Sequence, residues 1–165
     1  MQDNQDYLLN MIKITNDLLD QLSFEASISP RKRKNYNFHK EDSDCLQRML
    51  NALEPGTYIR PHKHINPGKR EVFILLKGII AVLEFDDRGN ITDHIILDRD
   101  KGNYATEITL GAWHTALSLE KGSVYYEVKD GPYDAAKDKI FANWSPEESS
   151  ENAPLYLKNI INKII

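Results

Sequence analysis

Short hydrophobic runs dominate the middle of the chain, and turn residues separate them at intervals of about 8–12 positions. The turns contain pairs such as Pro55-Gly56, Pro67-Gly68, Lys77-Gly78 and Lys121-Gly122. No long helical period interrupts this pattern, which argues against a parallel sheet with crossover helices. We therefore expect a mainly β chain, a sandwich or barrel, with strands in residues 46–53, 57–64, 71–76, 79–85, 91–97, 104–108, 113–119 and 124–129.

The two ends of the chain have a different pattern. Residues 12–14 look like a short strand, and Asn16-Asp17 can cap a helix that Pro30 ends. Pro154 can open a C-terminal helix, whose apolar side would hold Leu155, Leu157, Ile160, Ile161 and Ile164. We expect this side either to pack on its own barrel, as Phe141 and Trp144 would, or to pair two copies into a homodimer.

These patterns predict three segments. Residues 1–45 would hold an N-terminal extension, a helix and a basic connector; residues 46–130 would form the barrel; and residues 131–165 would form an irregular segment and a helix that packs on the barrel.

Composition narrows the class of protein. The net charge of −4 over 165 residues argues against a nucleic-acid binder, which normally has a basic excess. No apolar run approaches the ~20 residues of a membrane span, and the polar first residues do not resemble a secretory signal. Cys45, the single cysteine, excludes an intramolecular disulfide and a CxxC metal site, so the cytoplasm is the expected compartment.

Three histidines and one glutamate stand out against this background. His62 and His64 would project from the same face of a strand because they are two residues apart. The Pro67-Gly68 corner would bring Glu71 back beside them, and a tight turn at Gly111 would deliver His114. Three imidazoles and a carboxylate suit one divalent transition metal, with Fe, Mn, Zn, Ni and Co not distinguished. The alternative is that His62 and His64 are an exposed surface pair.

The same residues carry a resemblance to a known family. The segments GTYIRPHKH, Glu71 and GAWH resemble the two motifs of the cupin superfamily, and the chain is most similar to its WbuC-type metalloproteins. The resemblance implies a cupin double-stranded, jelly-roll-like β-barrel, with His62, His64, Glu71 and His114 as metal ligands. It also implies a link to O-antigen-type surface polysaccharide biosynthesis. The second motif departs from the usual pattern at Thr109 and Ser118.

Several residues are candidates for substrate binding. Strand parity would point Tyr58 and Arg60 into the barrel with the histidines, where Arg60 could contact a carboxylate or phosphate. Its alternative place is at the rim, or beside an internal acid such as Glu127. Asn51 would add a polar group to the lining. Part of the basic stretch would close over the barrel mouth and meet an anionic ligand, or else form a solvated connector; the residues concerned are Arg31, Arg33, Asn37 and His39.

Three functions remain open at this stage. A metal-assisted isomerisation of a sugar or sugar nucleotide is the favoured one, and a metal-dependent dioxygenase is the second. The third is a non-catalytic metal-containing module that binds a small-molecule ligand. The sequence identifies no catalytic residue beyond the predicted metal ligands.

Overall fold

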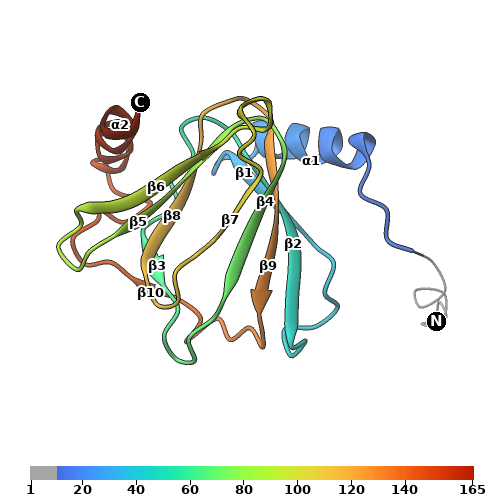
Figure 1. Cartoon of the computed structure of the whole chain (residues 1–165), viewed down its shortest axis with the longest axis horizontal. Coiled ribbons are helices and arrows are strands. Elements are labelled where there is room, and N and C mark those ends of the chain that lie inside the picture. The colour runs from blue at the N-terminus through green and yellow to red at the C-terminus, as the bar shows by residue number, and fades with distance from the viewer. Residues whose placement is uncertain (1–10) are drawn as a thin grey trace.

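The computed structural model describes residues 11–165, and in this range the chain forms two five-stranded antiparallel sheets (Figure 1). The first sheet has the order β1 (Arg33–Asn37), β2 (Leu46–Leu53), β9 (Ser123–Asp130), β4 (Glu71–Lys77) and β7 (Ala105–Glu107). The second has the order β10 (Ile140–Phe141), β3 (His62–Lys63), β8 (Trp113–Ser118), β5 (Ile80–Phe85) and β6 (Ile91–Leu97). The prediction of a mainly β, jelly-roll-like barrel is confirmed.

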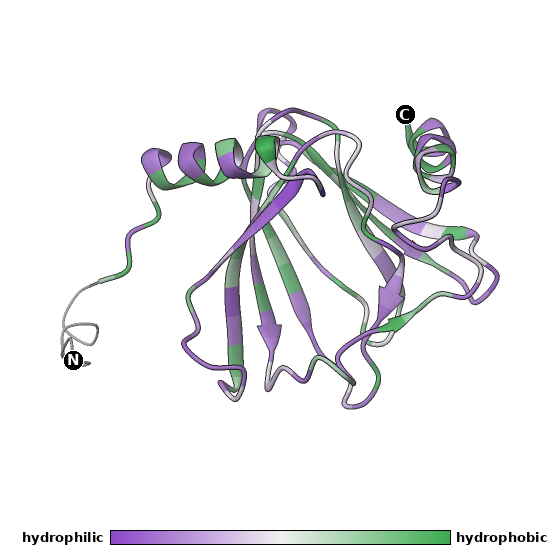
Figure 2. Cartoon of the chain, turned by 180° about the vertical axis from the view of Figure 1, so that it is seen from behind, coloured by the Kyte–Doolittle hydropathy of each residue, from purple (hydrophilic) through white to green (hydrophobic). Residues whose placement is uncertain are grey.

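Successive side chains of a strand point to opposite faces of its sheet, so each sheet turns one set of side chains toward a common interior. On β5, Ile80 and Val82 point inward and pack with Phe73 and Leu75 of β4. Figure 2 shows the resulting alternation of hydrophobic and hydrophilic residues along several strands.

The outer face of each sheet is covered by one helix, and the two helices lie on opposite sides of the molecule (Figure 1). Helix α1 (Asn16–Ile28) packs Leu19, Leu22 and Ala26 on Leu50 and Val124 of the first sheet.

Helix α2 (Ala153–Ile164) covers the second sheet in the same way. It packs Leu157 and Ile160 on Leu83, Phe85 and Leu117. The apolar side of α2 therefore lies on its own barrel, but Leu155 is 60% exposed, so its place in the predicted apolar side is wrong.

The N-terminal predictions need three corrections. Residues 12–14 form no strand, and the helix cap is Thr15 rather than Asn16-Asp17, because the Thr15 side chain accepts a hydrogen bond from the Leu18 amide. Residues 33–37 are no connector, since β1 pairs in register with β2. The predicted extension at residues 1–10 lies outside the described residues.

The predicted strand over residues 57–64 is mostly absent. Only His62–Lys63 is paired in a sheet, as β3, and residues 57–61 follow an irregular path. Cys45 is exposed.

The turn between β4 and β5 requires glycine at position 78. Gly78 has a φ of +74°, and a Cβ atom added there would lie 2.4 Å from the Oγ atom of Ser123. Any larger residue would strain this turn.

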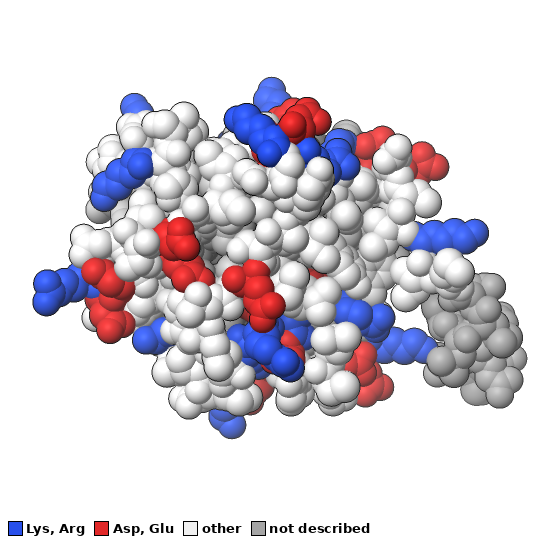
Figure 3. All heavy atoms as spheres, in the orientation of Figure 1, with Lys and Arg blue, Asp and Glu red and all other residues white. Residues whose placement is uncertain are grey.

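No helix in the described range is long and apolar enough to cross a membrane. Basic and acidic side chains are interspersed over the face that Figure 3 shows.

Candidate metal centre

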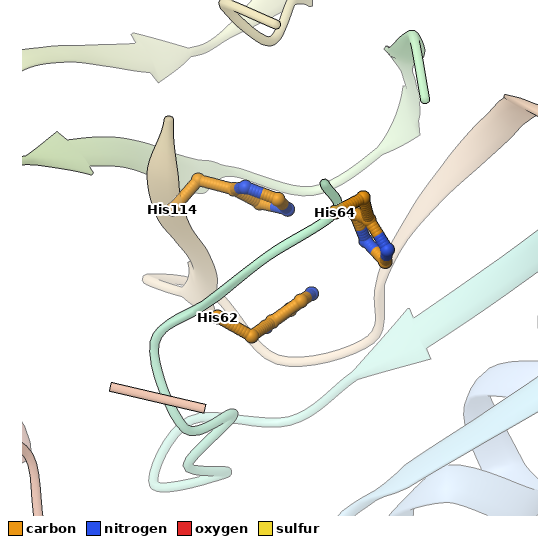
Figure 4. Close-up of side chains that lie close together, drawn as sticks. All are labelled: His62, His64 and His114. Atoms are coloured by element: carbon orange, nitrogen blue, oxygen red, sulfur yellow. The ribbon is translucent and has the colours of Figure 1, made fainter. Parts of the chain in front are cut away.

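The three predicted histidines come together inside the barrel. His62 on β3 lies directly opposite His114 on β8 in the antiparallel register, and their ring centroids are 4.5 Å apart. His64 follows β3 and turns its ring toward the same point (Figure 4). One ring nitrogen from each histidine lies within 4.8 Å of the others, and all three residues are buried.

Main-chain carbonyl groups fix the tautomer of each ring. Nδ1 of His62 donates to the Arg60 carbonyl and Nδ1 of His114 donates to the Ala112 carbonyl, each at 3.0 Å, while Nδ1 of His64 donates to the Asp138 carbonyl. A carbonyl oxygen only accepts, so Nδ1 carries the proton and Nε2 presents a lone pair. Burial lowers the pKa of His62 well below its usual range, which keeps that ring neutral.

Glu71 completes the cluster from the opposite sheet. Its Oε2 atom lies 2.9 Å from Nε2 of His114 and 3.3 Å from Nε2 of His64. Burial by itself would raise the pKa of Glu71, but the adjacent His114 and His64 rings lower it well below its usual range. The expected route was different: Glu71 does not return beside the histidines on a hairpin, because β3 and β4 belong to different sheets.

The donor atoms of this cluster fit a cation. Nε2 of His64, Nε2 of His114 and Oε2 of Glu71 are buried and have no hydrogen-bond partner among the described residues. Two lone-pair nitrogens facing a carboxylate oxygen repel one another unless a positive charge lies between them. A divalent metal would supply that charge, and imidazole with carboxylate suits first-row transition metals.

A buried ionic network lies next to Nδ1 of His64. The carboxylate of Asp138 lies between two lysines, with Oδ1 2.5 Å from Nζ of Lys69 and Oδ2 3.0 Å from Nζ of Lys129. All three residues are less than 10% exposed. The two ammonium groups outweigh burial and lower the pKa of Asp138. This network was not predicted from the sequence. Lys69 is 60 or more positions away from the other two residues, and Asp138 lies in a segment that was expected to be irregular.

A cavity of about 450 Å³ opens beside the cluster. Its walls include His62, Glu71 and His114, together with the inward side chains of β2 and β9. Several predicted binding residues lie along it: Asn51, Arg31, Arg33, Asn37 and His39.

Two of the cavity arginines are already paired with the protein itself. Arg31 and Arg33 both donate to Oε2 of Glu148, at 2.9 and 2.6 Å, and Arg33 also donates to the Tyr58 carbonyl at 2.8 Å. His39 accepts from the Arg48 amide through Nδ1.

Tyr58 and Arg60 do not line this cavity, so the parity argument that pointed them into the barrel is wrong. The reason is that residues 57–61 are not a regular strand. Tyr58 packs edge-on against Tyr156 of α2. Arg60 donates to the Ala142 carbonyl at 2.9 Å and lies 3.9 Å from the exposed Glu147, not beside Glu127.

Two further charged residues line the cavity, of which the sequence indicated Glu127 as an internal acid but did not indicate Lys139. Glu127 on β9 is buried, and its Oε2 accepts a hydrogen bond of 2.8 Å from Asn51. Lys139 follows the Asp138 network and reaches the same cavity. Burial raises the pKa of Glu127. Loss of solvation also lowers the pKa of Lys139, although much of this residue is exposed to solvent. Inward alternation on β9 accounts for the internal position of Glu127, but no local signal indicated Lys139.

Solved structures share the cupin fold of this barrel. The capsular polysaccharide assembling protein CapF from Staphylococcus aureus matches with a TM-score of 0.54 and 22% identity, over 65% of this chain and 28% of CapF. The lyase DddQ from Ruegeria pomeroyi DSS-3 matches at 0.51 and 17%, over 70% of this chain and 54% of that one. Oxalate oxidase in complex with glycolate matches at 0.52 and 15%, over 85% and 66%.

The chain thus spans less than two thirds of each of these proteins, and about a quarter of CapF. No curated protein matches the sequence. The barrel is a cupin fold, and a model of one sequence family, described as "Domain of unknown function (DUF6016)", matches residues 14–97. Because that match covers just over half of the chain, the protein belongs to the DUF6016 family.

Proposed function

We propose that this chain is a metal-binding cupin of the WbuC type that acts on a small anionic sugar or sugar nucleotide. One divalent transition metal would be held by His62, His64, Glu71 and His114. The observation that carries the proposal is the set of buried Nε2 and Oε2 atoms that face one another without hydrogen-bond partners in the described part of the chain.

A ligand site is favoured over a purely structural ion because the cluster forms part of a cavity wall. A metal there would polarise a carbonyl or hydroxyl oxygen of a bound sugar. Glu127 lines the same cavity, and its raised pKa suits a group that takes up and returns a proton. A metal-assisted isomerisation uses both features. The similarity to CapF, a capsular polysaccharide assembling protein, supports a substrate of the sugar class.

The test is elemental analysis of the protein purified without a metal-affinity step. We expect about one transition-metal ion per wild-type chain and almost none in the His114→Ala variant. The His94→Ala variant is the matched control, since His94 is exposed on β6, and it should keep the metal. Metal-free wild-type protein, or a His114→Ala variant that retains the full metal content, would refute the proposal.

A further inference from the structure

The charges around the cluster balance only as long as no metal is bound. The part of the cavity wall formed by β4, β9 and Lys139, together with the Asp138 network, contains the carboxylates Glu71, Glu127 and Asp138. This region also contains the ammonium groups of Lys69, Lys129 and Lys139. Among the described residues, the other charged members of the wall are Asp42, Glu148, Arg31, Arg33 and Lys34. A divalent ion would therefore leave its own double positive charge uncompensated in a poorly solvated space. Because buried charge is costly unless it is paired, an anionic ligand is favoured over a neutral one.

Most of the basic groups are already engaged by the protein. Arg31 and Arg33 share the carboxylate of Glu148, and Lys69 and Lys129 share that of Asp138. In the described part of the chain, Lys139 forms no hydrogen bond or ion pair with any other residue, yet it lines the cavity with His62 and Glu127. Lys34, which also lines the cavity, pairs with Glu25 at 3.3 Å. Among the described residues, Lys139 is thus the basic group of the cavity wall without an ion-pair partner.

The Glu127 side chain suits a ligand that carries hydroxyl groups. The Oε2 atom of Glu127 accepts from Asn51, and Oε1 has no hydrogen-bond partner in residues 11–165. Since a carboxylate oxygen accepts hydrogen bonds, it can bind a ligand hydroxyl group.

We propose that Lys139 is the anion-recognition residue of the cavity and that it binds the carboxylate or phosphate of a sugar acid or sugar phosphate, while Glu127 binds a ring hydroxyl. The inference rests on the proposed metal site and names the substrate class for it. The sequence suggested that Arg31 and Arg33 recognise the anion. The structure favours Lys139, which follows Asp138 in the chain, for this role.

Calorimetric titration of the protein loaded with Co²⁺ tests this inference. The probes are D-glucuronate, D-glucose 6-phosphate and D-glucose, which present a carboxylate, a phosphate and no charge on the same ring. We expect at least one of the two anions to bind wild-type protein about tenfold or more tightly than glucose. The preferred anion distinguishes a sugar acid from a sugar phosphate.

The decisive variant is Lys139→Gln, which should weaken binding of the preferred anion about tenfold or more. Lys139→Arg should retain most of the affinity, because it keeps the charge. Lys137→Gln is the matched control: Lys137 lies two positions away, is exposed and pairs with Asp134. This control should bind like wild-type protein.

Metal content and thermal unfolding of each sample separate the possible failures. Equal anion binding by wild type and a folded, cobalt-loaded Lys139→Gln variant would overturn the inference and leave the metal site intact. Equal binding of glucose and the two anions, or binding of neither anion at millimolar concentration, would also overturn it. Failure of wild-type protein to retain cobalt would instead refute the proposed metal site.

Discussion

Asp138 contacts His64 twice although 74 positions separate them: its carbonyl accepts from Nδ1 of His64, and its Oδ2 atom lies 3.5 Å from the same nitrogen. The residue that orients this ring is therefore also the counter-ion of two buried lysines. The position of His64 and the stability of the barrel consequently depend on a single residue.

Replacing Asp138 with alanine should lower the free energy of unfolding by about 3 kcal/mol or more, because it removes the carboxylate that pairs with the buried Lys69 and Lys129. Urea unfolding of the metal-free protein measures this loss. Asp134→Ala, in the exposed part of the same segment, should change stability by no more than about 0.5 kcal/mol. Wild-type stability of Asp138→Ala would show that the network contributes nothing.

Replacing Glu71 with glutamine should have opposite effects on the metal-free and metal-loaded protein. The amide can donate to the lone pair of an Nε2 atom, so the metal-free protein should be as stable as wild type or more stable. Metal affinity should fall about tenfold or more, since a charged ligand is lost. Chelator competition and thermal unfolding measure the two effects. A large loss of stability without metal would indicate that a protonated imidazole pairs with Glu71 in place of a metal.

Arg60→Ala should affect stability rather than ligand binding. It leaves the Ala142 carbonyl without the guanidinium donor and should cost about 1–2 kcal/mol. Because Arg60 lies outside the cavity wall, the affinity of the cobalt-loaded protein for its preferred sugar anion should not change. A marked loss of that affinity would restore the substrate role that the sequence suggested.

Helix α2 offers a matched pair of leucines. Leu157 packs on the second sheet and is 7% exposed, so Leu157→Ala should destabilise the protein by about 2–5 kcal/mol. Leu155 is 60% exposed, and Leu155→Ala should remain within about 0.5 kcal/mol of wild type. Equal effects in chemical denaturation would contradict the packing of α2 on its own barrel.

The amino-acid sequence by itself determined the mainly β class, most strand positions and the grouping of the histidines. These features depend on local information: a period of two within a strand, glycine and proline at its ends, and two histidines with identical parity. The turn at Gly111, which has a φ of +75°, was likewise predictable from the local sequence.

Only the tertiary structure decided which distant groups share the cavity. Glu71 faces the histidines from the other sheet, Asp138 contacts His64 from 74 positions away, and Glu127 and Lys139 line the same cavity from separate segments. Parity also failed for Arg60, because it holds only where the backbone is a paired strand and residues 57–61 are not. Charge balance around the cluster is thus a property of sheet packing, which brings together side chains that the sequence keeps far apart.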